Sequence, residues 1–136
     1  MKQIGLLMFL LCLTAVGAMA QDAVKADPKH YKVEYEDAQI RVLRIKYGPH
    51  EKSVMHEHPL GECAIYLTDE HTKNTAPDGK TSEDKIKAGT VSCSPPKAGK
   101  ELHLPENLSD QPLELILVER KTKPTAAKSS KAVKSR

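Results

Sequence analysis

The chain has 136 residues, of which 39% are hydrophobic and 4% are aromatic, and it contains no tryptophan. This length suits one domain and is too short for two domains of ordinary size. The formal net charge of +3 arises from one end, because residues 120–136 hold seven basic residues and no acidic one. Residues 21–119 hold 13 basic residues against 18 acidic ones, so the composition excludes a strongly basic domain and no nucleic-acid partner is expected.

The first twenty residues have the pattern of a secretory signal peptide. Lys2 precedes an apolar run from Ile4 to about Val16, and Ala18 and Ala20 form a small-residue cleavage motif. We therefore predict a signal-peptide helix over 1–20, cleavage before Gln21, and export to the periplasm or the cell exterior. The alternative is a membrane anchor, but the run is shorter than the ~20 apolar residues that a spanning helix needs. No membrane span is expected after cleavage.

Residues 21–32 are polar and contain Pro28, and we predict a polar leader there. From Val33 onward the chain is typical of short strands separated by turns. Segments rich in β-branched or apolar residues predict the strands, and Pro, Asp and Gly mark the turns between them. The expected extended segments are 39–47, 54–58, 63–69, a strand within 85–94 broken at Gly89, 101–104 and 113–119.

Outside the signal peptide no segment repeats apolar residues at helical spacing over three turns. Turn signals recur at intervals of about 8 to 12 residues, which is typical of an all-β sandwich or barrel. We therefore predict one all-β domain over 33–119. Residues 120–136 are basic and nearly free of large apolar side chains, so we predict a disordered tail.

Two cysteines, Cys63 and Cys93, lie within the predicted domain. In an oxidising compartment an even pair is typical of a disulfide. Two buried free thiols are the alternative, and both interpretations stay open at this level.

The stretch HEHPLGE, residues 56–62, places potential metal ligands close together. In an extended segment the side chains at i and i+2 share a face, so His56 and His58 project together. Pro59 and Gly61 allow a bend that returns Glu62 to the same face. Imidazole and carboxylate ligands suit Fe(II), Mn(II), Ni(II) or Zn(II).

A metal site usually draws a further ligand from a distant segment. His30 lies in the predicted leader, His50 in a turn and His71 in a predicted polar loop. His103 lies in the short strand expected at 101–104, from which an antiparallel barrel can direct its side chain inward. We therefore predict His103 as the distant ligand.

These motifs resemble those of small single-domain cupins over about residues 33–119. The first cupin motif is matched by Gly48, His56, His58 and Glu62 in the expected order, and the second by Gly89, Pro95, His103 and Asn107. There are departures: seven residues rather than five separate Gly48 from His56, and Asp69 stands where a glycine is expected. In the second motif Gly99 and His103 are both displaced along the chain.

The resemblance implies a double-stranded β-helix, or jelly-roll barrel, that holds a divalent metal on His56, His58, Glu62 and His103. Asn107 is expected as a turn residue rather than a ligand, and Tyr66 as a residue that fills or lines the barrel. The implied function is a metal-dependent dioxygenase or isomerase that acts on a small molecule. The alternatives are a non-catalytic small-molecule-binding module and an interaction domain anchored by the tail. Pairing as a homodimer is also implied.

Overall fold

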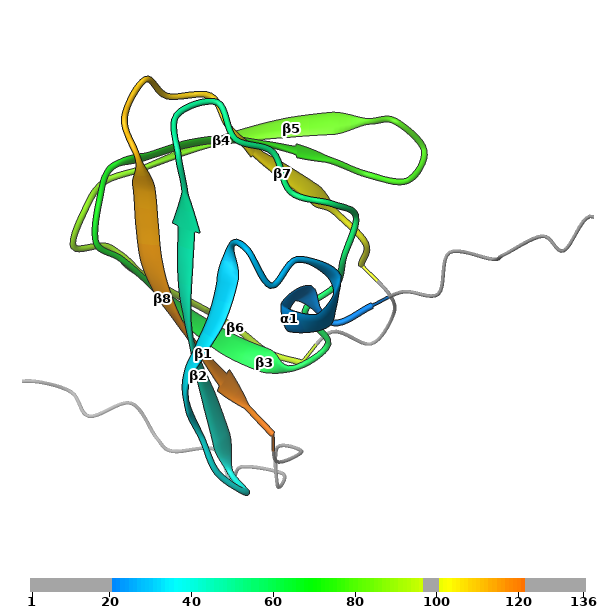
Figure 1. The fold of residues 1–136 in the computed structure, drawn as a ribbon, viewed down its shortest axis with the longest axis vertical. Coiled ribbons are helices and arrows are strands. Elements are labelled where there is room, and N and C mark those ends of the chain that lie inside the picture. The colour runs from blue at the N-terminus through cyan, green and yellow to red at the C-terminus, as the bar shows by residue number, and fades with distance from the viewer. Residues whose placement is uncertain (1–20, 97–100, 122–136) are drawn as a thin grey trace, which may run out of the picture.

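The computed structural model describes residues 21–96 and 101–121 (Figure 1). The predicted signal peptide and the predicted tail beyond Lys121 lie outside the described residues. Within the described ranges, no helix is both long enough and apolar enough to cross a membrane. The elements in chain order are α1 (Ala23–Ala26), β1 (Tyr31–Glu36), β2 (Ile40–Tyr47), β3 (Gly61–Tyr66), β4 (Glu70–Thr75), β5 (Thr81–Ile86), β6 (Val91–Ser94), β7 (Leu104–Asn107) and β8 (Leu113–Arg120).

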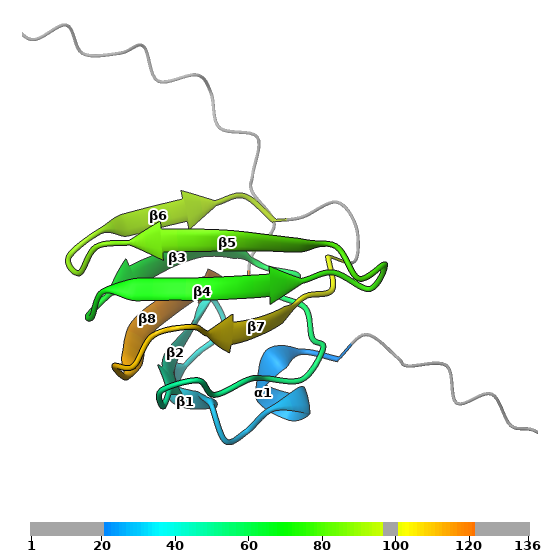
Figure 2. The same cartoon turned by 90° about the horizontal axis from the view of Figure 1, so that it is seen from above.

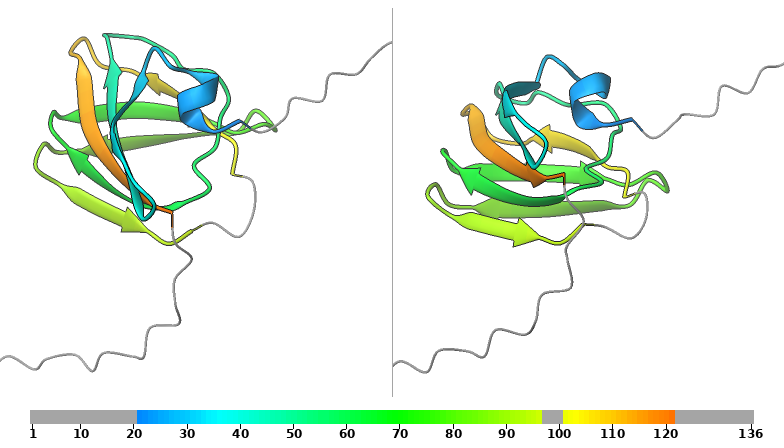
Figure 3. Two further views of the ribbon diagram at one scale, coloured as in Figure 1. Left: turned by 60° about the horizontal axis from the view of Figure 1, so that its bottom comes forward. Right: turned by 90° about the horizontal axis from the view of Figure 1, so that it is seen from below.

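The described strands form two antiparallel sheets. The larger sheet has the order β1-β2-β8-β3-β6, and the smaller one has the order β5-β4-β7. In Figure 1 the smaller sheet lies at the top, β3 and β6 lie toward the bottom, and β2 and β8 run between them. Figures 2 and 3 show the smaller sheet across from β3 and β8, and side chains of both sheets line one interior cavity. The prediction of an all-β fold is confirmed.

The apolar core lies along the inner face of β2 and β8. These two strands pair along their whole length, with Leu43 opposite Leu117. Alternate residues of β8 are buried, as the period of two in a strand requires. The buried apolar residues of the two strands are Leu43, Ile45, Tyr47, Leu113, Leu115 and Leu117. Each fully buried leucine contributes about 1.5–3 kcal/mol, so this pair of strands supplies much of the stability of the barrel.

The segment expected as a polar leader carries buried residues into the fold. Ala23 on α1 is fully buried, and Asp27 and His30 are buried behind it. The first strand begins at Tyr31 rather than Val33, and the Tyr31 side chain belongs to the core. The leader packs because Asp27 accepts hydrogen bonds from His30 and Ser53, which satisfies its polar atoms inside the structure.

The structure corrects the expectation of a polar loop around His71. Residues 70–75 form β4, which pairs with β5 on one side and β7 on the other. The strand has no large apolar side chain, so its sequence lacks the hydrophobic alternation that predicts strands. The expected break at Gly89 is present, because Gly89 has a φ of +82° in the turn between β5 and β6.

Cys63 and Cys93 are joined by a disulfide. They lie directly opposite each other on β3 and β6, with Cα atoms 4.0 Å apart. Of the two interpretations that the sequence left open, the structure has the disulfide. It ties β6, an edge strand whose residues are largely exposed, to its neighbour β3.

Candidate metal centre

The histidines of the HEHPLGE stretch lie in the connection between β2 and β3. Here the backbone of His56 forms an isolated antiparallel bridge with that of His103. The amide of His56 donates to the carbonyl of His103 at 3.0 Å, and the amide of His103 donates back at 2.9 Å. This reciprocal pairing places His103 beside His56 although the two are far apart in the sequence.

The structure brings three of the four predicted ligands into one cluster. Each of His56, His58 and His103 offers a ring nitrogen, and these nitrogens all lie within 4.8 Å of one another. The ring centroids are 5.1 Å apart for His56 and His58, and 4.7 Å apart for His56 and His103. Metal–nitrogen bonds of ~2.1 Å require only a small further approach of these rings to a common ion. We call these residues the three-histidine cluster.

His56 has the strongest features of a metal ligand. Its side chain is fully buried, and its Nδ1 lies 2.8 Å from the carbonyl oxygen of Val54. That contact assigns the proton to Nδ1, which leaves a lone pair on Nε2. Nε2 is buried and has no hydrogen-bond partner among the described residues. A buried polar atom without a partner costs free energy, and a bound cation would remove that cost.

The environment keeps the His56 ring neutral. Burial, with a smaller contribution from the charge of His58, lowers the pKa of His56 to about 4. A histidine binds metal through its neutral form, so little proton release is needed at neutral pH. The residues present therefore fit a divalent metal.

Glu119 is a residue of the candidate site that the sequence analysis did not identify. Its side chain is fully buried at the end of β8, and its Oε1 lies 3.3 Å from Nδ1 of His58. Arg41 donates to its other oxygen and also binds Asp22. Burial by itself would raise the pKa of Glu119, but the hydrogen bonds from His58 and Arg41 outweigh burial and lower it.

This arrangement orients His58. A carboxylate that accepts from Nδ1 assigns the proton to that nitrogen and leaves Nε2 to bind a metal. One sequence feature could have identified Glu119: it continues the inward alternation of Leu113, Leu115 and Leu117 on β8. A charged residue at a buried strand position usually has a specific partner.

Glu62 lies beside His58 but not within the three-histidine cluster. Its Oε2 is 3.9 Å from Nδ1 of His58, on the side of the ring where Glu119 also lies. It groups with His58 and Glu119 as a second set of potential ligands. Its backbone position is restricted by Gly61, where an added Cβ would lie 2.7 Å from Pro96. The geometry thus places Glu62 beside His58 and outside the set formed by the three histidines.

The remaining candidate residues lie elsewhere. Both ring nitrogens of His30 face carboxylates, Asp27 at 2.6 Å and Glu51 at 3.1 Å, and His50 is exposed beside Asp110. Asn107 is buried and donates to two backbone carbonyls, which is the turn role expected for it.

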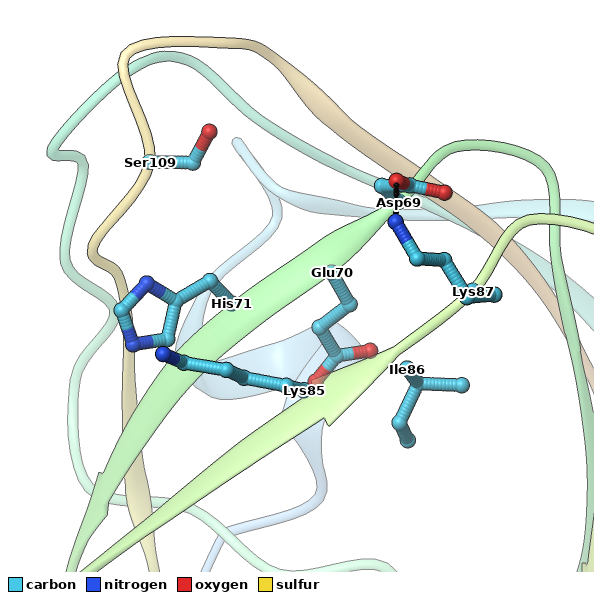
Figure 4. A pocket seen from close by; sticks show the side chains of 7 residues that line it. All are labelled: Asp69, Glu70, His71, Lys85, Ile86, Lys87 and Ser109. Carbon is cyan, nitrogen blue, oxygen red and sulfur yellow. Dashed lines mark hydrogen bonds and ion pairs between the residues drawn. The ribbon is translucent and has the colours of Figure 1, made fainter.

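His71 faces a groove of about 300 Å³ at the start of β4 and the end of β5, which Glu70 and Ile86 share with the interior cavity. Figure 4 shows His71 and Lys85 in this groove, together with the ion pair between Lys87 and Asp69. The groove is lined by both signs of charge. Among the described residues, neither of the two sets of potential metal ligands includes a residue of this groove.

The three-histidine cluster borders an interior cavity of about 230 Å³, which His58 and His103 help to line. Alternate residues of the strands point into it, with leucines from β8 on one side and Glu70, Thr72 and Asn74 of β4 on the other. Tyr66 lines the same cavity. This volume accommodates only a small molecule.

No family model matches this sequence, and no curated protein matches it. Among solved structures the chain is similar to a cupin domain from Bordetella pertussis, with a TM-score of 0.60 and 17% identity over 78% of this chain and 100% of that one. A cupin-like protein from Thermotoga maritima gives a TM-score of 0.51 and 21% identity over 68% of each chain. A protein with a double-stranded β-helix domain from Klebsiella pneumoniae gives a TM-score of 0.50 and 18% identity over 67% of this chain and 75% of that one. This chain therefore has the double-stranded β-helix fold of these cupin structures, which is the fold that its two motifs predicted.

Proposed function

We propose that this protein is exported and holds a divalent transition metal between His56, His58 and His103, where the metal faces a small molecule in the barrel cavity. The observation that carries the proposal is the buried Nε2 of His56, which lacks a hydrogen-bond partner among the described residues and lies among two further imidazoles. Glu119 holds His58 in the tautomer that binds metal, and Val54 does the same for His56.

Three neutral imidazoles favour Fe, Mn, Ni or Zn over harder cations such as Ca²⁺. A divalent ion in this site supplies Lewis-acid chemistry toward an oxygen donor of a small molecule. The protein contributes an orienting carboxylate and a cavity that limits the size of the ligand. The proposed activity is that of a metal-dependent dioxygenase or isomerase.

Elemental analysis of the purified protein tests the metal site. We expect a stoichiometric divalent metal in the wild type and its loss in His56→Ala and His103→Ala. His50→Ala is the matched control, because His50 is exposed and lies outside the cluster. Equal metal content in all four proteins would remove the proposal.

The role of Glu62 is tested by Glu62→Gln in the same assay. The cupin motif predicts Glu62 as a fourth ligand, whereas its position beside His58 and Glu119 favours a metal held by the histidines alone. Retention of the metal in Glu62→Gln supports the three-histidine site, and loss supports the four-ligand set.

Oxygen consumption with a panel of phenols and diketones separates catalysis from binding. Metal-dependent turnover that His56→Ala abolishes supports the dioxygenase assignment. Stoichiometric metal and ligand binding without turnover supports the alternative, a non-catalytic binding module.

Export is supported by the pattern of residues 1–20 and by the disulfide between Cys63 and Cys93, since disulfides persist in oxidising compartments. Fractionation of cells followed by N-terminal sequencing tests it, with Gln21 expected as the first residue. Pairing as a homodimer is a further proposal, which light scattering of the purified protein tests.

A further inference from the structure

The charged groups that line the cavity beside the three-histidine cluster, apart from its histidines, are all carboxylates. Glu70 on β4 and Asp84 on β5 line it, and Glu62 on β3 adds a third carboxylate. Among the described residues that line this cavity there is no lysine or arginine. The one basic residue of β5, Lys85, lines the groove beside His71 and not this cavity, whereas Glu70 lines both.

Two of these carboxylates are held by neutral donors. Thr72 donates from its hydroxyl to Glu70 at 2.5 Å, and Asn74 donates from its amide to Asp84 at 3.2 Å. A carboxylate can accept about four hydrogen bonds, so these contacts orient Glu70 and Asp84 without neutralising their charge.

The carboxylates act together on the cavity, Glu70 and Glu62 from half-buried positions and Asp84 from an exposed one. Burial, together with the negative charges of Glu70, Asp84 and Glu62, raises the pKa of the Tyr66 hydroxyl to about 12. Burial, followed by the charge of Asp84, raises the pKa of Glu70. A negative field therefore extends into the cavity, and a positively charged group there would relieve the cost of burying Glu70.

The opposite end of the cavity offers a different chemistry. His58 and His103 line it there, and the buried Nε2 of His56 faces the same two rings. Glu62 also lies at this end, with its Oε2 3.9 Å from Nδ1 of His58. The pairing of β4 with β7 places Leu104, which follows His103, opposite Thr75 at the end of β4, whereas Glu70 begins that strand. A ligand that spans the cavity thus meets the proposed metal at one end and Glu70 and Asp84 at the other. Tyr31, Tyr47 and Tyr66 also line the cavity, and aromatic rings attract organic cations through their π faces.

We propose that the cavity selects a small molecule that carries an ammonium group, which faces Glu70 and Asp84, and an oxygen donor, which faces the three-histidine cluster. This inference rests on the proposed function, because the oxygen donor requires the metal. It disfavours ligands that carry a carboxylate at the end away from the metal, since that carboxylate would lie against a wall of the same charge.

Three catechols that differ only in the charge of the side chain provide the test. The probes are 4-(2-aminoethyl)catechol, 4-ethylcatechol and 3,4-dihydroxyphenylacetate, which are cationic, neutral and anionic. Binding is measured by calorimetry without oxygen, on the full chain loaded with Co²⁺. We expect the cationic probe to bind most tightly, at least about tenfold more tightly than the anionic one, from a charge pair at intermediate dielectric.

Glu70→Gln and Asp84→Asn each replace a carboxylate by an amide of nearly the same shape. Each should reduce the preference for the cationic probe several-fold and leave the melting temperature unchanged. Glu83→Gln is the matched control, because Glu83 lies next to Asp84 on β5 but bonds His71 on the outer side. It should leave the preference unchanged.

Metal content, measured first, separates the two proposals. A wild-type protein that binds no Co²⁺ overturns the proposed function. A protein that binds Co²⁺ but binds the three probes equally, or binds none of them, overturns this inference alone. Loss of the preference in Glu83→Gln to the same extent as in Asp84→Asn also overturns it, since the effect would then be one of general charge.

Discussion

The two walls of the barrel interior are built by different means. The leucine wall consists of Leu43, Ile45, Leu113, Leu115 and Leu117 on β2 and β8, all of them buried. The polar wall consists of Glu70, Thr72, Asn74 and Asp84 on β4 and β5, which line the cavity. The first wall is stabilised by removal of apolar surface from water, and the second by hydrogen bonds and strand pairing. The comparison separates the part of the barrel that holds the fold from the part that faces a ligand.

The largest effect is expected on the leucine wall. Leu43→Ala removes a fully buried side chain and should lower the free energy of unfolding by about 3–4 kcal/mol, through lost burial and the cavity left behind. Asn74→Ala on the polar wall removes a hydrogen bond to an exposed carboxylate and should cost about 1 kcal/mol or less. Urea unfolding of both variants measures the contrast. Equal losses of unfolding free energy in the two variants would show that the two walls contribute equally to stability.

The disulfide should have the next largest effect, because β6 buries little surface of its own. Replacing both Cys63 and Cys93 by serine should lower the free energy of unfolding by about 2–4 kcal/mol, since the loop between them is no longer closed in the unfolded chain. Val91→Ala is a suitable control on the same strand, because Val91 is 60% exposed. If the double serine variant is as stable as Val91→Ala, noncovalent contacts alone hold β6 in the sheet.

Glu119 lies where the leucine wall ends at the three-histidine cluster, so it should affect both stability and metal binding. Glu119→Gln weakens the contact with Arg41 and should cost about 2 kcal/mol. It also loosens the orientation of His58, and Co²⁺ affinity should fall about 10- to 100-fold.

The matched control for Glu119 is Glu114→Gln, on the same strand but on its outer face beside Arg44 and Lys46. Calorimetric titration with Co²⁺ should give the wild-type affinity for this variant. A drop of equal size in both variants would assign the effect to general loss of charge.

The leucine wall could be predicted from the sequence, and the polar wall could not. The strand at 113–119 was predicted because it is the most apolar segment of the domain, and the structure has Leu113–Arg120. The strand at Glu70–Thr75 was missed because its inward side chains face a cavity and carry no hydrophobic pattern. Hydrophobic periodicity marks strands that contact an apolar core, so it does not detect a strand whose inward side chains face a cavity.

The candidate site shows the same division. The spacing of His56 and His58 predicts a shared face, because it depends only on local geometry. The pairing of Glu119 with His58 spans 61 residues, and it depends on strand order rather than on any local pattern. The burial of His30 was likewise hidden, since its partners Asp27 and Glu51 come from either side of β1 and β2.

The smallest expected effect is a loss of stability in acid. The leucine wall contains no group that titrates, so we assign this loss to carboxylates outside it, beginning with Glu51. Hydrogen bonds from Lys29, from the Gly48 amide and from His30 lower the pKa of Glu51 to about 2, from 4.5. The ionised form is thus favoured in the folded protein, and its stabilising contribution is present above pH 4.5 and lost as the pH falls toward 2. Melting temperatures measured between pH 6 and pH 2, at intervals of about one unit, should fall more steeply for the wild type than for Glu51→Gln. Parallel curves would mean that acid acts on other carboxylates, with the buried Asp27 as the next candidate, because hydrogen bonds from Ser53 and His30 lower its pKa against the effect of burial.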